Sequence, residues 1–115
     1  MQVLFYQTAS GRIPVREALL ELPREDSAFA YELLKEIEET GFQASRVVFR
    51  QIKSKLWEIK MNLPGTGGYR IFYFTVRADT LLLLHSYVKK SQKSPQRHIE
   101  TAEQRMRDAM KRSSR

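Results

Sequence analysis

Several kinds of residue and segment are absent or scarce in this 115-residue chain, and each absence narrows the possibilities. There is no cysteine, so disulfides and thiolate metal sites are excluded, which suits a reducing cytoplasm. No apolar run approaches the roughly 18 residues that a membrane span requires, and the N-terminus lacks the features of a signal peptide. We therefore expect one small cytoplasmic domain over residues 1–115, with its last residues frayed and no membrane contact.

Acidic residues are scarce in the second part of the chain. Residues 1–45 hold four Lys or Arg against eight Asp or Glu, whereas residues 46–115 hold sixteen against five. Net charge is therefore −4 in the first part, +11 in the second and +7 overall. This asymmetry is typical of a surface for nucleic acid or an acidic protein, and a merely solubilising basic surface is the alternative. With only Glu58 and Asp79 between residues 46 and 99, a two-metal nuclease centre is disfavoured, and we expect no metal and no cofactor.

Hydrophobic periodicity predicts an α+β fold. Residues 42–55 mix apolar and basic side chains without a clean period and are interpreted as a loop, with a short extended piece at 47–49. Asp26 or Ser27 is expected to cap the second helix. Short linkers favour a small antiparallel sheet with two N-terminal helices packed on one face and a C-terminal helix. The expected elements are strands at 3–6, 56–62, 69–77 and 80–88, and helices at 14–22, from 26 or 27 to 41, and from 95 onward.

Strand alternation separates a core face from an open face. Trp57, Ile59 and Met61 should face the helices, which leaves Glu58 and Lys60 on the open face. Cations there can bind phosphate and aromatic rings can stack on bases, so the combination favours RNA. RNA can also be cut without metal, because its 2′-hydroxyl can attack the adjacent phosphate. The residues expected on this face are Lys60, Arg70, His85, Tyr87 and Lys89.

Each of these residues also has a structural interpretation. Arg70 can pair with Glu58 on the neighbouring strand. His85 beside a leucine run is typical of a structural histidine, and Tyr87 can pack at the rim of the core. The lysines at positions 89, 90 and 93 can form a solvated edge that discourages strand pairing.

Four segments resemble the RelE/ParE toxin superfamily, and most closely its phage-derived, HigB-like branch. They are residues 56–60 (Leu-Trp-Glu-Ile-Lys), residues 68–74 (Gly-Tyr-Arg-Ile-Phe-Tyr-Phe), residues 82–95, which end in Lys-Lys-Ser-Gln-Lys-Ser-Pro, and the tail 99–106 (Ile-Glu-x-Ala-x-x-Arg-Met). The resemblance implies a RelE-like toxin domain and the fold expected above. It also implies a toxin of a type II toxin–antitoxin system that acts as a ribosome-dependent mRNA interferase. Cleavage would proceed by 2′-hydroxyl attack without metal.

The resemblance also implies partners and site residues. The partners are the ribosome with its mRNA, a cognate helix-turn-helix antitoxin from an adjacent gene, and operator DNA bound by the toxin–antitoxin complex. Three positions depart from the RelE pattern: Glu58 replaces a lysine, Ser91 a late arginine and Arg97 a late tyrosine. The catalytic candidates are Lys60, Arg70, His85, Tyr87 and Lys90, and the candidates for binding RNA or phosphate are Lys53, Lys55, Lys89, Lys93 and Arg97.

Two other functions stay open, because fold alone does not set the target. ParE members of the superfamily inhibit DNA gyrase without cleaving RNA. A degenerate member would use its basic face only to bind an antitoxin or DNA.

Overall fold

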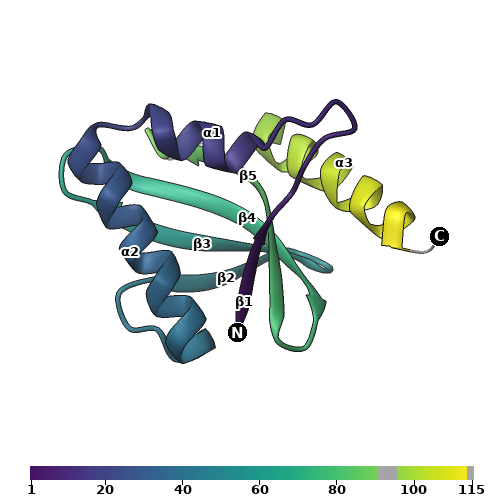
Figure 1. The fold of residues 1–115 in the computed structure, drawn as a ribbon, viewed down its shortest axis with the longest axis horizontal. Coiled ribbons are helices and arrows are strands. Elements are labelled where there is room, and N and C mark those ends of the chain that lie inside the picture. Colours follow the sequence, from purple (N-terminus) through teal and green to yellow (C-terminus); the bar gives the residue numbers. More distant parts are fainter. Residues whose placement is uncertain (91–95, 114–115) are drawn as a thin grey trace.

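The computed structural model describes residues 1–90 and 96–113 and has the predicted α+β architecture (Figure 1). Most expected elements are present within a few residues of their predicted bounds. They are β1 (Gln2–Phe5), α1 (Pro14–Glu21), α2 (Arg24–Thr40), the short 3₁₀ helix η1 (Gly41–Gln43), β2 (Val48–Lys53), β3 (Leu56–Leu63), β4 (Gly67–Arg77), β5 (Thr80–Val88) and α3 (Gln96–Ser113). No helix in the described part of the chain is long and apolar enough to be a membrane span.

The five strands form one mixed sheet in the order β1-β5-β4-β3-β2. The prediction of a purely antiparallel sheet was wrong, because β1 pairs with β5 in parallel, with Val3 opposite Leu81. A long crossover that includes α1, α2 and three strands separates β1 from β5, and such a crossover permits parallel pairing. The other three pairings are antiparallel, as short connections require.

The interpretation of residues 42–55 as a loop was also wrong over much of its length. Residues 48–53 form β2, which pairs with β3 at the sheet edge and places Phe49 opposite Ile59. Four of its six residues are exposed, including Arg50 and Lys53. An edge strand with solvated side chains shows little hydrophobic alternation, so its sequence does not look like a strand.

One face of the sheet forms the main hydrophobic core with α1 and α2. Ile59 and Ile71, both fully buried, pack there with Leu19 of α1 and Leu33 of α2. Met61 belongs to the same cluster and Trp57 packs against it, which confirms the predicted alternation along β3. Figure 1 shows α2 at the left of the molecule, α1 along the top and α3 at the upper right.

The opposite face, which was expected to be open, is partly covered by α3. Ala102 of α3 is fully buried there, in a second cluster with Phe72 and Leu84. The narrow apolar stripe of α3 packs on this part of the sheet and leaves most of the helix's basic residues outward, whereas Arg105 is partly buried against β5. The rest of the face carries polar and aromatic side chains, described below.

A β-bulge in β5 changes which side chains meet on the α3 face. His85 is opposite Phe72 and Leu83 is opposite Tyr73, so Leu84 is an extra residue between them. Leu84 therefore joins the cluster under α3, although simple alternation places it on the other face from His85. Bulges of this kind re-aim neighbouring side chains and are frequent beside functional sites.

Asp26 does not cap α2, contrary to prediction, because the helix already begins at Arg24 after Pro23. Its buried carboxylate instead accepts hydrogen bonds from the backbone of Gly65 at 2.8 Å and of Thr66 at 2.7 Å, and from the Thr66 hydroxyl. These donors lie in the turn between β3 and β4. The carboxylate therefore ties that turn to the first turns of α2.

Candidate functional site

Three of the predicted site residues lie directly opposite one another on adjacent strands. Lys60 of β3 is the cross-strand partner of Arg70 of β4, and Arg70 is the partner of Tyr87 of β5. We call these three residues the Lys60 row. Directly opposed side chains are about 5 Å apart at their Cβ atoms, so one phosphate group can contact both cations. Arg70 and Lys60 are partly buried, which strengthens their fields compared with fully solvated cations.

The next row of the same face contains a buried carboxylate. Glu58 was predicted to lie on an open face, and it does lie on that face, but its side chain is completely buried. Its Oε1 atom lies 3.1 Å from Nη2 of Arg50 and 3.9 Å from Nε of Arg70, and it makes no hydrogen bond among the described residues. The Tyr87 hydroxyl donates to the other oxygen at 3.4 Å. The suggested pairing of Arg70 with Glu58 is therefore present only as a long contact.

Tyr87 remains a hydrogen-bond donor at physiological pH. Burial, together with the nearby negative charge of Glu58, raises the pKa of its hydroxyl to about 12. The ring stacks on Phe72 at 5.6 Å between centroids and on His98 at 4.3 Å. Little of this ring is free to stack on a nucleic-acid base, because it is only 8% exposed. Hydrogen-bond donation is thus the chemistry that Tyr87 can supply.

The two histidines of the chain meet beside the Lys60 row. Nε2 of His85 on β5 lies 2.8 Å from Nδ1 of His98 on α3, and the two rings stack at 5.0 Å. Burial, together with the positive charge of Arg105 and the proximity of His98, lowers the pKa of His85 to about 4. Burial also lowers the pKa of His98, with Arg97 contributing in the same direction. Both imidazoles are therefore neutral at physiological pH.

The lysines at the end of β5 frame the Lys60 row. The backbone of Lys89 donates to the carbonyl of Gly68 at 2.9 Å, which places it beside Arg70. A methyl group at Gly68 would lie 3.4 Å from Nη1 of Arg70 and 3.3 Å from Cβ of Lys89, so glycine leaves the space that both side chains use. Lys90 is exposed just beyond the strand, and Lys93 lies outside the described residues.

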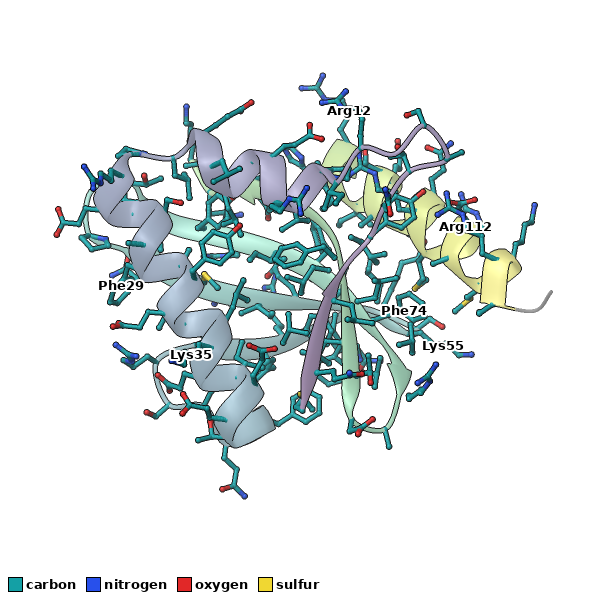
Figure 2. The ribbon with its side chains drawn as sticks, in the orientation of Figure 1. Arg12, Phe29, Lys35, Lys55, Phe74 and Arg112 are labelled. Carbon is teal, nitrogen blue, oxygen red and sulfur yellow. The ribbon has the colours of Figure 1, made fainter. Side chains whose placement is uncertain are left out.

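Two of the predicted RNA-binding lysines lie far from this site. Lys53 pairs with Glu103 of α3 at 3.0 Å, so its charge is already partly neutralised. Lys55 lines a surface pocket with Met110 of α3, and Figure 2 shows Lys55 on the side of the molecule where α3 ends. His98 lies near the other end of that helix, about 18 Å away along its axis. The structure therefore separates these two lysines from the Lys60 row, while Arg97 is exposed in the first turn of α3.

Sequence reasoning missed four residues of this site. Arg50 and Glu58 were not selected, although strand alternation already placed Glu58 on the same face as Lys60. His98 and Arg105 were not selected either, yet they flank the buried Ala102 at helical spacing and therefore share one face of α3. That spacing, together with the presence of only two histidines, was the available signal.

Together these features define a small α+β domain that carries a cationic site with paired histidines on one face of a mixed sheet. The model of the family described as Phage derived protein Gp49-like (DUF891) matches residues 17–107, and the chain belongs to this family. The family is a phage-derived, RelE/toxin-like group, which agrees with the resemblance noted in the sequence at that coarser level. The matched segment includes every residue of the Lys60 row and both histidines. No curated protein matches the chain significantly.

Proposed function

We propose that this protein is the toxin of a type II toxin–antitoxin system, of the HigB-like branch, and that it cleaves mRNA on the ribosome. Membership of a phage-derived, toxin-like family supports the general class. The observation that carries the proposal is the Lys60 row itself, in which two cations and a neutral hydroxyl donor lie in register beside two histidines.

The site supplies what metal-free RNA cleavage needs. The 2′-oxygen forms a bond to phosphorus and the bond from phosphorus to the 5′-oxygen breaks, while solvent takes the 2′ proton and protonates the leaving oxygen. Negative charge develops on the phosphate oxygens, and cations fixed in place before the reaction stabilise it most. Arg70 and Lys60 are held in this way by the sheet, and the Tyr87 hydroxyl can donate a further hydrogen bond when it turns from Glu58 to the phosphate.

Glu58 determines how the cations are presented. Its buried carboxylate lies between Arg50 and Arg70, so it attracts both guanidinium groups toward the sheet. Only part of the positive charge is offset, because Lys60 and Lys89 make no ion pair among the described residues. An anionic backbone that approaches this face therefore meets a net positive surface.

The proposal is tested by expressing the protein without its antitoxin and mapping mRNA ends by primer extension. We expect growth arrest and new 5′ ends within translated mRNA. Arg70→Ala should reduce cleavage about 100-fold or more, the usual cost of a lost charge-stabilising donor. Arg77→Ala is the matched control, because Arg77 is exposed at the other end of the same strand and should leave cleavage unchanged.

Other outcomes would contradict the proposal in distinct ways. Intact mRNA during growth arrest, together with DNA damage and gyrase inhibition, would select the ParE-like activity. Absence of toxicity would favour a member that only binds its antitoxin or DNA. We also expect a helix-turn-helix protein from an adjacent gene to copurify with the chain, and operator DNA to bind the pair.

A further inference from the structure

Arg105 connects α3 to the histidine pair, although the proposed chemistry assigns it no part. Its Nη1 atom donates to the carbonyl of Leu84 at 2.9 Å and lies 3.2 Å from Nδ1 of His85. The two hydrogens on this one nitrogen are thus directed to the β-bulge residue and to the neighbouring imidazole. The guanidinium also lies 6.0 Å from the centroid of the Tyr6 ring, which holds it from another side.

The chemistry of these groups fixes where each proton is. A guanidinium has only donors and keeps its charge in proteins, so Nδ1 of His85 must accept from Arg105. His85 therefore carries its proton on Nε2, which donates across 2.8 Å to Nδ1 of His98. His98 must then carry its own proton on Nε2. Arg105 therefore sets the donor-to-acceptor direction of both hydrogen bonds, from Arg105 to His85 and from His85 to His98.

We propose that Arg105 is a positioning residue that locks both histidines as neutral Nε2–H tautomers, so that His98 serves as a hydrogen-bond donor to the bound phosphate. The phosphate part of this inference rests on the proposed RNA cleavage, whereas the tautomers do not. The histidines then differ from an ordinary acid–base pair. Neither ring has a free basic nitrogen. Nδ1 of His85 faces the Arg105 cation, and Nδ1 of His98 already accepts a hydrogen bond from His85.

The surroundings of the rings support a permanently neutral pair. The charged groups that act on them in the described chain are Arg105 and Arg97, both on α3, and no carboxylate there offsets these cations. Phe72 of β4 and Tyr87 of β5 cover the rings with neutral surface. A proton added to His98 would have to displace the hydrogen bond from His85, and His85 cannot pass a proton onward toward Arg105.

His98 is suitably placed for a donor. It is partly exposed, and its ring lies nearly parallel to that of Tyr87, 8° apart. Tyr87 is directly opposite Arg70, so His98 lies at the end of the Lys60 row. A neutral imidazole there can stabilise an oxyanion without changing its own protonation state, as neutral histidine electrophiles do in other enzymes.

The first experiment measures imidazole nitrogen shifts by ¹⁵N NMR, which needs no RNA. The two histidines are assigned with His85→Gln and His98→Gln. We expect both wild-type rings to be neutral Nε2–H tautomers at pH 7 to 8, and His85 to stay neutral down to about pH 5.5. Arg105→Met should raise the pKa of His85, although burial still holds it below its ordinary value, and should let the ring mix tautomers. Arg107→Met, at an exposed neighbouring site on α3, should change nothing.

A wild-type His85 protonated on Nδ1, or titrating near pH 6.5, would overturn the inference. Unchanged histidine shifts in a folded Arg105→Met protein would do the same. If Arg105→Met fails to fold, the wild-type spectra still test the predicted tautomers. Arg105→Lys keeps a charged donor and should retain the neutral tautomers.

The second experiment measures the pH dependence of mRNA cleavage. We expect the wild-type rate to show no histidine limb between about pH 6 and 8. Arg105→Met should lower the rate about 10-fold and add a histidine limb at the acid end of this range, and Arg105→Lys should restore part of the rate. A wild-type limb near pH 6.5 that His98→Gln removes would assign His98 to proton transfer and overturn the donor role. If the wild type cleaves no mRNA but gives the expected NMR result, the proposed function and the phosphate contact are rejected. The tautomers set by Arg105 are then still supported.

Discussion

Asp26 and Glu58 are both almost completely buried carboxylates, but their surroundings differ. Asp26, which is 1% exposed, accepts two backbone N–H groups and a hydroxyl from the turn between β3 and β4. Glu58, which is 0% exposed, has among the described residues a single long hydrogen bond, from Tyr87, and two arginines nearby. One carboxylate lies on the α2 side of the molecule and the other on the α3 side.

The difference separates a structural region from a functional one. A buried charge is costly unless hydrogen bonds or opposite charges compensate it. The compensation at Asp26 is made of short, local hydrogen bonds that stabilise the fold and leave nothing for a ligand. The compensation at Glu58 is incomplete and comes from Arg50 and Arg70, whose guanidinium groups remain able to attract an anion.

The largest expected effect on stability is at Asp26. Asp26→Asn removes the charge that attracts three donors and leaves at least one of them poorly paired, so the free energy of unfolding should fall by about 2–3 kcal/mol. Urea denaturation measures this change. Glu25→Gln is the matched control, because Glu25 is an exposed acid in the same first turn of α2 and should cost less than about 0.5 kcal/mol. Equal losses in the two variants would contradict the structural role of Asp26.

Acid should weaken the two regions in different pH ranges. The pKa of His85 is lowered to about 4 in the folded protein. Between about pH 6.5 and pH 4, the His85 ring therefore stays neutral in the folded protein but binds a proton in the unfolded chain. This stabilisation is complete above about pH 6.5 and is lost progressively toward pH 4. The hydrogen bonds from Thr66 and Gly65 lower the pKa of Asp26, so the stabilisation from Asp26 is lost only below its ordinary pKa of about 3.9.

The measurement compares urea denaturation at pH 7 and pH 5. Wild type should lose about 1–2 kcal/mol more than His85→Gln, a figure reduced for the partial exposure of the ring. Glutamine keeps an acceptor for Arg105 and a donor for His98 but does not titrate. An identical pH dependence in the two proteins would show that His85 is not held neutral by the fold.

A smaller stability effect is expected at Glu58. Glu58→Gln keeps the shape and the hydrogen bond to Tyr87 and loses no hydrogen bond at Oε1, so unfolding should change by about 1 kcal/mol or less. Affinity for a short single-stranded RNA should rise about fivefold, because Arg50 and Arg70 lose their counter-charge. Fluorescence anisotropy measures it, with Glu100→Gln as the control of equal charge change on exposed α3 surface. If RNA affinity rises no more in Glu58→Gln than in Glu100→Gln, Glu58 does not influence the RNA-binding site.

The smallest stability effect is expected at Gly68. Gly68→Ala should change the free energy of unfolding by less than about 0.5 kcal/mol, because the backbone there is ordinary and the unfolded chain becomes less flexible. The new methyl group crowds Arg70 and Lys89, so mRNA cleavage should fall about 3–10-fold. Thr75→Ala, at an exposed site on the same strand, should leave cleavage unchanged. Full activity in Gly68→Ala would show that the position of Arg70 is not critical.

Much of the fold was predictable because local patterns determine it. Which side of an element faces the core determines its apolar pattern. The helical periodicity predicted for α1 and α2 and the alternation predicted for β3 are both confirmed. The errors occur where packing outweighs pattern. The edge strand β2 lacks alternation because most of it is solvated, and the parallel pairing of β1 depends on a free edge that only the assembled sheet provides.

The candidate site was predictable in part for the same reason. Lys60 and Arg70 share a face by strand alternation, and their opposition follows from the hairpin register of β3 and β4. The separation of Lys53 and Lys55 from that row was not predictable, because it depends on where α3 crosses the sheet.

The sequence by itself determined the core face, the basic character of the second part of the chain and the resemblance to a toxin family. Only the tertiary structure decided that Glu58 is buried, that a bulge at Leu84 reorients β5, and that His98 and Arg105 reach His85. The physical reason is the separation of the interacting residues along the sequence. Alternation and charge are local properties, whereas these contacts join residues 13 to 29 positions apart and exist only once the strands have paired and α3 has packed on the sheet.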